Sequence, residues 1–149
     1  SPSNFEVRVE LLPKLAGELV VPAAVVAEIE AGPASDPARA WLRGDGAKWT
    51  RPDLTVLPTI AAWDLGEGET AVLNWAVQRR TFEAILDDRA ARKCAQIQGI
   101  PCRGTLGVIL AAKKHGLIPA AKPLCDQVVQ AGLLIEPVLL RGALGLVGE

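Results

Sequence analysis

The chain has 149 residues and a formal net charge of −1, with half of its residues hydrophobic and 22% charged. That length supports one domain with a full core, and this composition excludes an intrinsically disordered chain. The near-neutral charge does not mark the whole chain as a nucleic-acid binder, and no apolar run approaches the ~18 residues that span a membrane. We therefore expect a single domain over residues 1–149 without a membrane segment.

The cysteines favour a reducing compartment. Cys94, Cys102 and Cys125 are odd in number and widely spaced, which argues against a disulfide framework. The chain has one histidine and no C-x-x-C pair, so the sequence also argues against a structural zinc site. We expect a cytoplasmic protein.

The first half of the chain consists of short elements separated by proline and glycine. Glu18 to Val21 predicts a short strand, and Ala23 to Glu30 predicts a helix. Ser35-Asp36-Pro37 is a capping signature, because an oxygen-bearing cap followed by proline favours a helix start. It predicts a short helix over Ala38 to Leu42, and Leu54 to Leu57 is a candidate edge strand.

The second half alternates helices and strands more regularly. The expected helices cover Thr70 to Arg80, Arg89 to Gln98, Leu106 to Lys114, Lys122 to Gln130 and Pro137 to Leu146, and the expected strands cover Thr81 to Leu86, Ile100 to Cys102 and Leu133 to Ile135. Such alternation is typical of α/β proteins. We expect a three-layer α/β/α fold with a mostly parallel central sheet.

Four carboxylates stand where these strands end or these helices begin. Asp87 and Asp88 follow the central strand, Glu69 begins a helix, and Glu28 lies at the edge of the apolar side of its helix. Because ligands bind at the carboxyl ends of the strands in open α/β sheets, we expect these acids to converge there. Acids at helix starts also complement the helix dipole, at ~0.3–1 kcal/mol each. An N-cap role would explain one aspartate of the adjacent pair, and we expect it not to explain both.

Clustered carboxylates indicate a divalent-metal site. They would hold one or two Mg²⁺ or Mn²⁺ ions, which lower the pKa of bound water and stabilise the leaving oxygen in phosphodiester hydrolysis. Arg89 and Arg92 follow the acids and would contact phosphates, although a solvated helix face also explains them. Thr105 either caps the next helix or points its hydroxyl at the acids.

Other chemistries have less support in the sequence. His115 follows two lysines at a helix end, so no Ser-His-Asp arrangement is apparent, and no G-x-x-x-x-G-K-[ST] loop is present. Gly66 and Gly68 lack the rest of a dinucleotide fingerprint and instead indicate a close backbone approach or an unusual dihedral. A receiver-like phosphoacceptor would need a lysine after a later strand, whereas Lys113 and Lys114 fall inside a predicted helix.

Four motifs in register resemble the PIN-domain family. They are VPAAVVAEI over residues 21–29, LGEGETA over residues 65–71, LDDRAAR over residues 86–92 and GTLG over residues 104–107. Their order and spacing are most similar to a prokaryotic VapC-like subgroup with the pattern G-E-x-x-A, L-D-D-x-x-A-R and G-T-L-G. Each motif alone is weak, but four in the same order make a specific signal.

The resemblance implies a metal-dependent ribonuclease, an endonuclease that uses Mg²⁺ or Mn²⁺. On this basis Glu28, Glu69, Asp87 and Asp88 are the catalytic acids, with Glu28, Glu69 and Asp88 as metal ligands. Arg89, Arg92 and Thr105 would contact the RNA. Many bacterial members are toxins held by a cognate antitoxin protein, and the apolar composition suits an antitoxin surface or a homodimer.

The chain departs from the family pattern at its start. The family's first strand ends in a D-[ST]-S-P turn with a ligand aspartate, and Ser1-Pro2 resembles the tail of that turn. We therefore expect the first strand and its aspartate to lie before Ser1. A site that lacks one of about four carboxylates binds a divalent ion less well. The alternative function is a catalytically inactive PIN-like module that binds nucleic acid or a partner protein.

Overall fold

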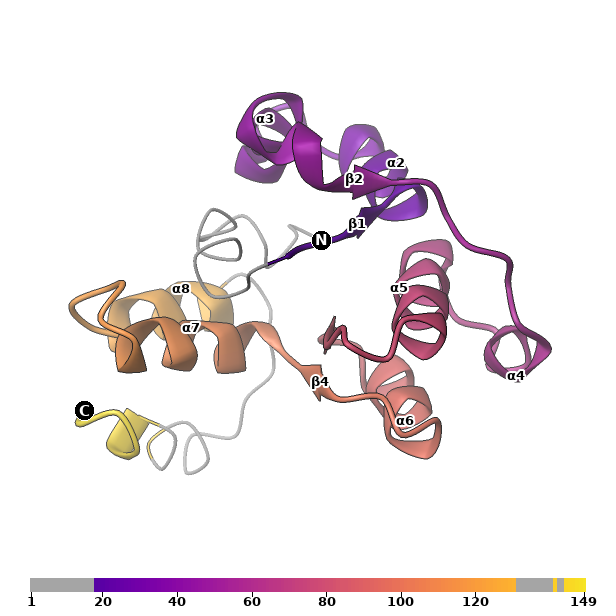
Figure 1. Cartoon of the computed structure of the whole chain (residues 1–149). Helices are drawn as coiled ribbons and strands as arrows, with labels where there is room; N and C mark the ends of the chain where they lie inside the picture. Colours follow the sequence, from indigo (N-terminus) through magenta and orange to yellow (C-terminus); the bar gives the residue numbers. More distant parts are fainter. Residues whose placement is uncertain (1–17, 131–140, 142–143) are drawn as a thin grey trace.

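Short parallel strands interleaved with helices make up the computed structural model, which describes residues 18–130, 141 and 144–149 (Figure 1). This is the mixed α/β architecture that the alternating pattern predicts. The expected strand over Leu133 to Ile135 and most of the expected helix over Pro137 to Leu146 lie outside the described residues. None of the described helices is long and apolar enough to cross a membrane.

The described elements follow the predicted order closely. They are β1 (Val21–Pro22), α2 (Ala23–Ala31), α3 (Pro37–Arg43), the 3₁₀ helix η3 (Asp45–Trp49), β2 (Thr50–Arg51), α4 (Pro58–Ala61), α5 (Glu67–Gln78), β3 (Ala84–Ile85), α6 (Arg89–Ile97), β4 (Cys102–Arg103), α7 (Thr105–Lys114) and α8 (Lys122–Gln130). The predicted helices that fall in the described residues match their ranges within a few residues, whereas η3 and α4 were not predicted and the strands are shorter than expected.

The described strands form two separate parallel pairs. In the first pair Val21 of β1 lies opposite Thr50 of β2, and in the second Ala84 of β3 lies opposite Cys102 of β4. Pro101 has no N–H to donate, so the second ladder begins at Cys102 rather than at Ile100 as predicted. The prediction of parallel strands is confirmed.

The edge strand predicted over Leu54 to Leu57 is wrong. The strand lies earlier, at Thr50–Arg51, and side chains of α5 hold the backbone that follows. Asn74 is fully buried, and its Oδ1 accepts from the Leu57 N–H at 2.8 Å. The indole N–H of Trp75 donates to the Pro52 carbonyl at 3.1 Å. These side-chain bonds take up backbone groups that a strand would offer to a neighbour.

The predicted cap at the start of α3 is confirmed. Asp36 accepts from the Ala38 N–H at 2.9 Å at the start of α3, with Pro37 as the first helical residue. Gly99 and Gly116 follow α6 and α7 with φ of 70° and 73°, the left-handed conformation that glycine adopts without strain. The start of α3 and the ends of α6 and α7 are therefore set by residues close to them.

The core is gathered in separate clusters. One packs α5, β3 and α6 together around Leu73, Leu86 and Cys94, while another packs α7 and α8 around Ile109 and Cys125. In Figure 1, α7 and α8 lie together on one side of the view, and α4, α5 and α6 lie on the other. β4 connects the two sides along the chain.

The start of α8 is held by a carboxylate from the end of the sequence. Glu149 accepts from the Ala121 N–H at 2.6 Å and from the Lys122 N–H at 3.0 Å. These backbone hydrogen bonds lower the pKa of Glu149 from its ordinary value of 4.5, and Lys113 and Lys122 add to the effect. The carboxylate also faces the positive end of the helix dipole.

We expect Glu149→Gln to destabilise the protein at neutral pH and to have little effect in acid. A carboxyl group whose pKa is lowered by folding stabilises the folded state above its unfolded pKa, and this contribution is lost as the pH falls through the folded value. Urea unfolding midpoints of the two proteins should therefore differ at pH 7 and converge well below pH 4.5. An equal difference at both pH values would contradict this account.

Candidate functional site

Glu28 reaches from α2 to the first turn of α5. The two helices pack against each other, and Glu28 Oε1 accepts from the Gly68 N–H at 2.9 Å. Gly68 is buried, and a Cβ at its position would lie 2.5 Å from Glu28 Oε2. The carboxylate therefore rests directly on the backbone of Gly68, at the positive end of α5.

Glu69 lies against the same turn. Its Oε2 would be 2.5 Å from a Cβ at Gly66, the N-cap residue of α5. Gly66 has a φ of −58°, so an unusual dihedral does not explain this glycine. Of the two explanations for the G-E-G motif, close backbone approach is the correct one, because each glycine makes room for a glutamate.

Asp87 is bound on both carboxylate oxygens by Thr105. Its Oδ1 accepts from the Thr105 N–H at 2.8 Å and its Oδ2 from the Thr105 hydroxyl at 2.5 Å. Thr105 is buried at the start of α7, so the aspartate fixes the end of β3 to the start of that helix. Of the two roles considered for Thr105, the structure shows the hydroxyl pointing at an acid.

Asp88 caps α6. Its Oδ2 accepts from the Ala91 N–H at 2.9 Å, and its backbone is extended, as is usual for an N-cap. The expectation that an N-cap role explains only one aspartate of the pair is confirmed, because the N-cap of α7 is Gly104 and not Asp87. Asp88 caps α6, whereas Asp87 accepts hydrogen bonds from Thr105, the first residue of α7. Pairing of β3 with β4 brings the start of α7 beside the end of β3.

Carboxylates at helix starts recur in this structure. Asp53, which the sequence reasoning missed, accepts from the Ala24 N–H at 3.1 Å in the first turn of α2. Its position after β2 parallels that of Asp87 after β3, and this was the signal available in the sequence. Favourable interaction with the helix dipole therefore explains Glu28, Asp53 and Asp87, whose carboxylates bind the first turns of helices other than their own.

Arg92 lies near Asp87. A Cβ at Gly104 would be 3.0 Å from both Arg92 Nη1 and Asp87 Oδ1, so the guanidinium and the carboxylate approach the same glycine. Gly104 is the first residue of the GTLG motif and lies at a junction between strand and helix, but it was not among the predicted site residues. Arg89 is exposed one turn earlier in α6. This places one predicted phosphate contact next to the acids.

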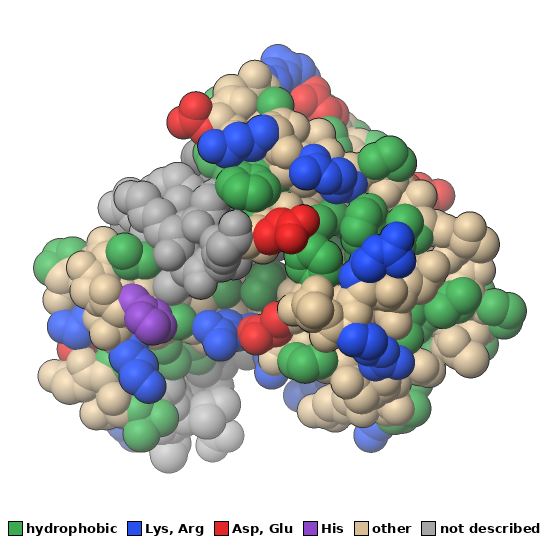
Figure 2. All heavy atoms as spheres, viewed as in Figure 1, with side chains coloured by type: hydrophobic (Ala, Val, Ile, Leu, Met, Phe, Trp, Pro, Cys, Tyr) green, Lys and Arg blue, Asp and Glu red, His purple; other side chains and the backbone are tan. Residues whose placement is uncertain are grey.

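Charges of both signs share the visible surface. Figure 2 shows lysine and arginine side chains distributed over this face, with acidic and hydrophobic side chains between them. Nearby pairs include Arg103 with Glu83, whose Nε and Oε1 atoms are 2.9 Å apart. The distribution agrees with the net charge of −1.

The donor chemistry suits Mg²⁺ or Mn²⁺, but the described side chains alone do not complete a site. Carboxylate oxygens are the ligands that these ions prefer. In the part of the chain that the structure describes, however, no three acidic, histidine or cysteine side chains are placed to hold one ion. Glu28 of α2 and Glu69 both lie against the first turn of α5, and Asp87 and Asp88 both follow β3. Their assignment as catalytic acids and ligands stays a prediction.

Comparison with known proteins identifies the family. The family model DUF3368, described as a PIN domain, matches residues 7–149. Searches of curated proteins and of solved structures gave no significant match. The matched range includes all four motifs and the acids described above. The chain belongs to the PIN-domain family.

Proposed function

We propose that this protein is a metal-dependent endoribonuclease that hydrolyses RNA phosphodiester bonds with Mg²⁺ or Mn²⁺. The match of the PIN-domain family model to residues 7–149 carries the proposal. The carboxylates around the first turn of α5 and at the end of β3 support it, because they offer oxygen ligands on neighbouring elements. By its resemblance to VapC-like proteins, we also propose that it is a toxin with a cognate antitoxin and that it forms a homodimer.

The predicted catalytic acids differ in their surroundings, because two of them are exposed whereas Asp87 is bound by the buried Thr105. Glu28 and Asp88 are exposed, and each accepts a backbone hydrogen bond through one carboxylate oxygen. Thr105 engages both oxygens of Asp87. We therefore assign Glu28, Glu69 and Asp88 to catalysis and Asp87 to positioning the end of β3, with Arg89 and Arg92 binding phosphates.

The decisive variant is Asp88→Asn, which should remove activity without removing the helix cap. Asparagine caps helices about as well as aspartate, so the free energy of unfolding should change little. It is a poorer ligand because it has one neutral oxygen. We expect labelled structured RNA to be cleaved by the wild-type protein with Mn²⁺, and cleavage to fall about tenfold or more in the variant.

Two controls complete the experiment. EDTA should stop cleavage by the wild-type protein, and restored Mn²⁺ should return it. Asp126→Asn changes an exposed aspartate of α8 that pairs with Lys122 at 2.8 Å, and it should leave cleavage unchanged. Cleavage that is indifferent to both EDTA and Asp88→Asn would overturn the proposal, since a contaminating nuclease would behave in that way.

A second candidate function is a catalytically inactive PIN-like module. One observation favours it: each of Glu28, Asp87 and Asp88 already accepts a backbone hydrogen bond at a helix start, which is a sufficient structural role. Such a module would bind RNA or a partner protein without turnover. RNA binding in a filter or mobility assay with no cleavage in Mn²⁺ or Mg²⁺ would favour this candidate over the ribonuclease.

A further inference from the structure

Two groups of opposite charge converge on Gly104, between β4 and α7. A Cβ at Gly104 would be 3.0 Å from Arg92 Nη1, 3.0 Å from Asp87 Oδ1 and 3.6 Å from the Leu86 carbonyl oxygen. Gly104 is buried, and its φ of −90° and ψ of 176° are angles that residues with a side chain also adopt. Space therefore explains this glycine, because a methyl group there would crowd the Arg92 guanidinium.

Asp87 is a fixed anchor for that guanidinium. Thr105 donates its N–H to Oδ1 and its hydroxyl to Oδ2, so the carboxylate cannot turn without losing hydrogen bonds. Arg92 is exposed on α6, where an arginine side chain samples many rotamers. Opposite charges that approach the same point attract each other. The carboxylate therefore favours the rotamers that keep the guanidinium at Gly104.

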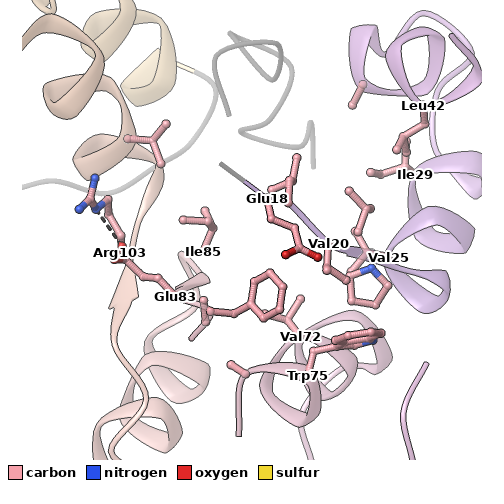
Figure 3. A pocket seen from close by; sticks show the side chains of 18 of the residues that line it. Glu18, Val20, Val25, Ile29, Leu42, Val72, Trp75, Glu83, Ile85 and Arg103 are labelled. Carbon is pink, nitrogen blue, oxygen red and sulfur yellow. Dashed lines mark ion pairs between the residues drawn. The ribbon is translucent and has the colours of Figure 1, made fainter. Parts of the chain in front are cut away.

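Two other arginines near the acids are placed differently. Arg103 directly precedes Gly104, but its Nε pairs with Glu83 Oε1 at 2.9 Å. Figure 3 shows this ion pair in the wall of the pocket that lies between the two strand pairs. Arg89 is the exposed first residue of α6. Of these three arginines, Arg92 is the one whose guanidinium is among the atoms nearest to Gly104.

We propose that Arg92 is a catalytic residue whose guanidinium donates to a non-bridging oxygen of the RNA phosphate that is cleaved. This inference rests on the proposed ribonuclease function. A guanidinium has five N–H donors, so an anchor at Asp87 leaves donors for phosphate. The Arg92 N–H donates to the Asp88 carbonyl at 3.0 Å. Phosphate bound at Arg92 therefore lies one helical turn from a predicted catalytic acid.

The guanidinium acts on charge that develops during hydrolysis. Water adds to phosphorus, the bond from phosphorus to the leaving ribose oxygen breaks, and a proton passes in net from the water to that oxygen. As water adds, negative charge grows on the non-bridging oxygens, and a donor that is already fixed stabilises it without reorganising. Arg92 therefore affects kcat, whereas an arginine that only binds phosphates along the RNA affects KM. Asp87 is a positioning residue because it acts through Arg92.

Initial rates on labelled RNA with Mn²⁺ separate kcat from KM. Arg92→Ala is expected to lower kcat about tenfold or more with little change in KM, and Arg92→Lys should recover only part of the loss. Arg89→Ala should mainly raise KM. An unchanged kcat in Arg92→Ala, with an active wild-type protein, would overturn the inference and leave the proposed function standing.

A double variant shows whether Gly104 acts through Arg92. Gly104→Ala alone should lower kcat, because the methyl displaces the end of the arginine side chain. Gly104→Ala combined with Arg92→Ala should have the kcat of Arg92→Ala, since no guanidinium is left to displace. A further loss of kcat in the double variant would overturn the positioning role. Urea midpoints control for folding, and the exposed Arg92→Ala decides the inference if Gly104→Ala fails to fold.

A binding measurement needs neither RNA nor metal. The Nε–H signal of Arg92 is followed by NMR during titration with inorganic phosphate. We expect the signal to shift in the wild-type protein and in Gly145→Ala, where a Cβ would meet nothing within 4 Å, and the shift to be lost in Gly104→Ala. Absence of the shift in the wild-type protein would overturn the inference. A shift in a protein that cleaves no RNA would overturn the proposed function and the catalytic role of Arg92, and only its phosphate contact would stand.

Discussion

Gly68→Ala is expected to remove most of the ribonuclease activity while the fold stays intact. The added methyl would lie 2.5 Å from Glu28 Oε2 and 2.8 Å from its Cδ, so the carboxylate must leave the Gly68 N–H. Glu28 is exposed, and its side chain has other staggered rotamers, so it can move away at little cost. Misplacement of a catalytic group by about 1 Å can reduce the rate about 100-fold, and we expect a loss of that order.

The stability of the Gly68→Ala protein should be equal to that of the wild type or slightly higher. Gly68 is the second residue of α5, and alanine is favoured over glycine in helices by roughly 0.5–1 kcal/mol. This gain offsets the loss of the hydrogen bond from Gly68 to Glu28, which is worth about 1 kcal/mol. The variant should therefore lose activity without losing stability. If Glu28 only held α5 in place, any loss of activity would accompany a loss of stability.

Initial rates on labelled RNA and urea unfolding curves measure the two effects. Gly145→Ala is the matched control, since a Cβ there would meet nothing within 4 Å. It should change neither rate nor stability by much. Full activity in Gly68→Ala would contradict a catalytic role for Glu28, and a loss of activity that tracks a loss of folded protein would leave only the structural role.

Asp87→Asn is expected to reduce the free energy of unfolding by about 1.5–3 kcal/mol, the range for hydrogen bonds to a charged group. Thr105 donates to both oxygens of Asp87, through its N–H and its hydroxyl. Asparagine keeps one accepting oxygen and presents an NH₂ group to the second donor. The start of α7 is thereby separated from the end of β3.

The neighbouring aspartate supplies the control for Asp87→Asn. Asp88→Asn makes the same chemical change one residue away, yet it keeps the single acceptor that caps α6. Urea unfolding should therefore show a much smaller loss for Asp88→Asn than for Asp87→Asn. Equal losses in the two variants would mean that charge at the end of β3, and not the two-point contact with Thr105, supports the fold.

Several features of this fold were predictable because their signals are local. Asp36 with Pro37 marks the start of α3, and Gly99 marks the end of α6, each within a residue or two of the helix. A cap or a left-handed terminator acts on the backbone next to it, so the residue type and its neighbours suffice. The helices were accordingly placed better than the strands.

The strands and the acid contacts depend on distant parts of the chain. Nothing near Leu54 to Leu57 shows that Asn74 will bind its backbone. Likewise, 40 residues separate Glu28 from Gly68, and 18 separate Asp87 from Thr105. Such partners are chosen by how the helices and strands pack, and a pattern of residue types along the chain does not contain that choice.

The sequence by itself determined the helix order, the parallel α/β class and the family, because hydrophobic periodicity, local caps and motif spacing are all written along the chain. Only the tertiary structure decided what each acid touches. It places Asp88 against the first turn of α6 and Asp87 against the start of α7, and it contains a pocket between the two strand pairs. The physical reason is that a buried donor or strand edge takes whichever acceptor the packing brings within reach.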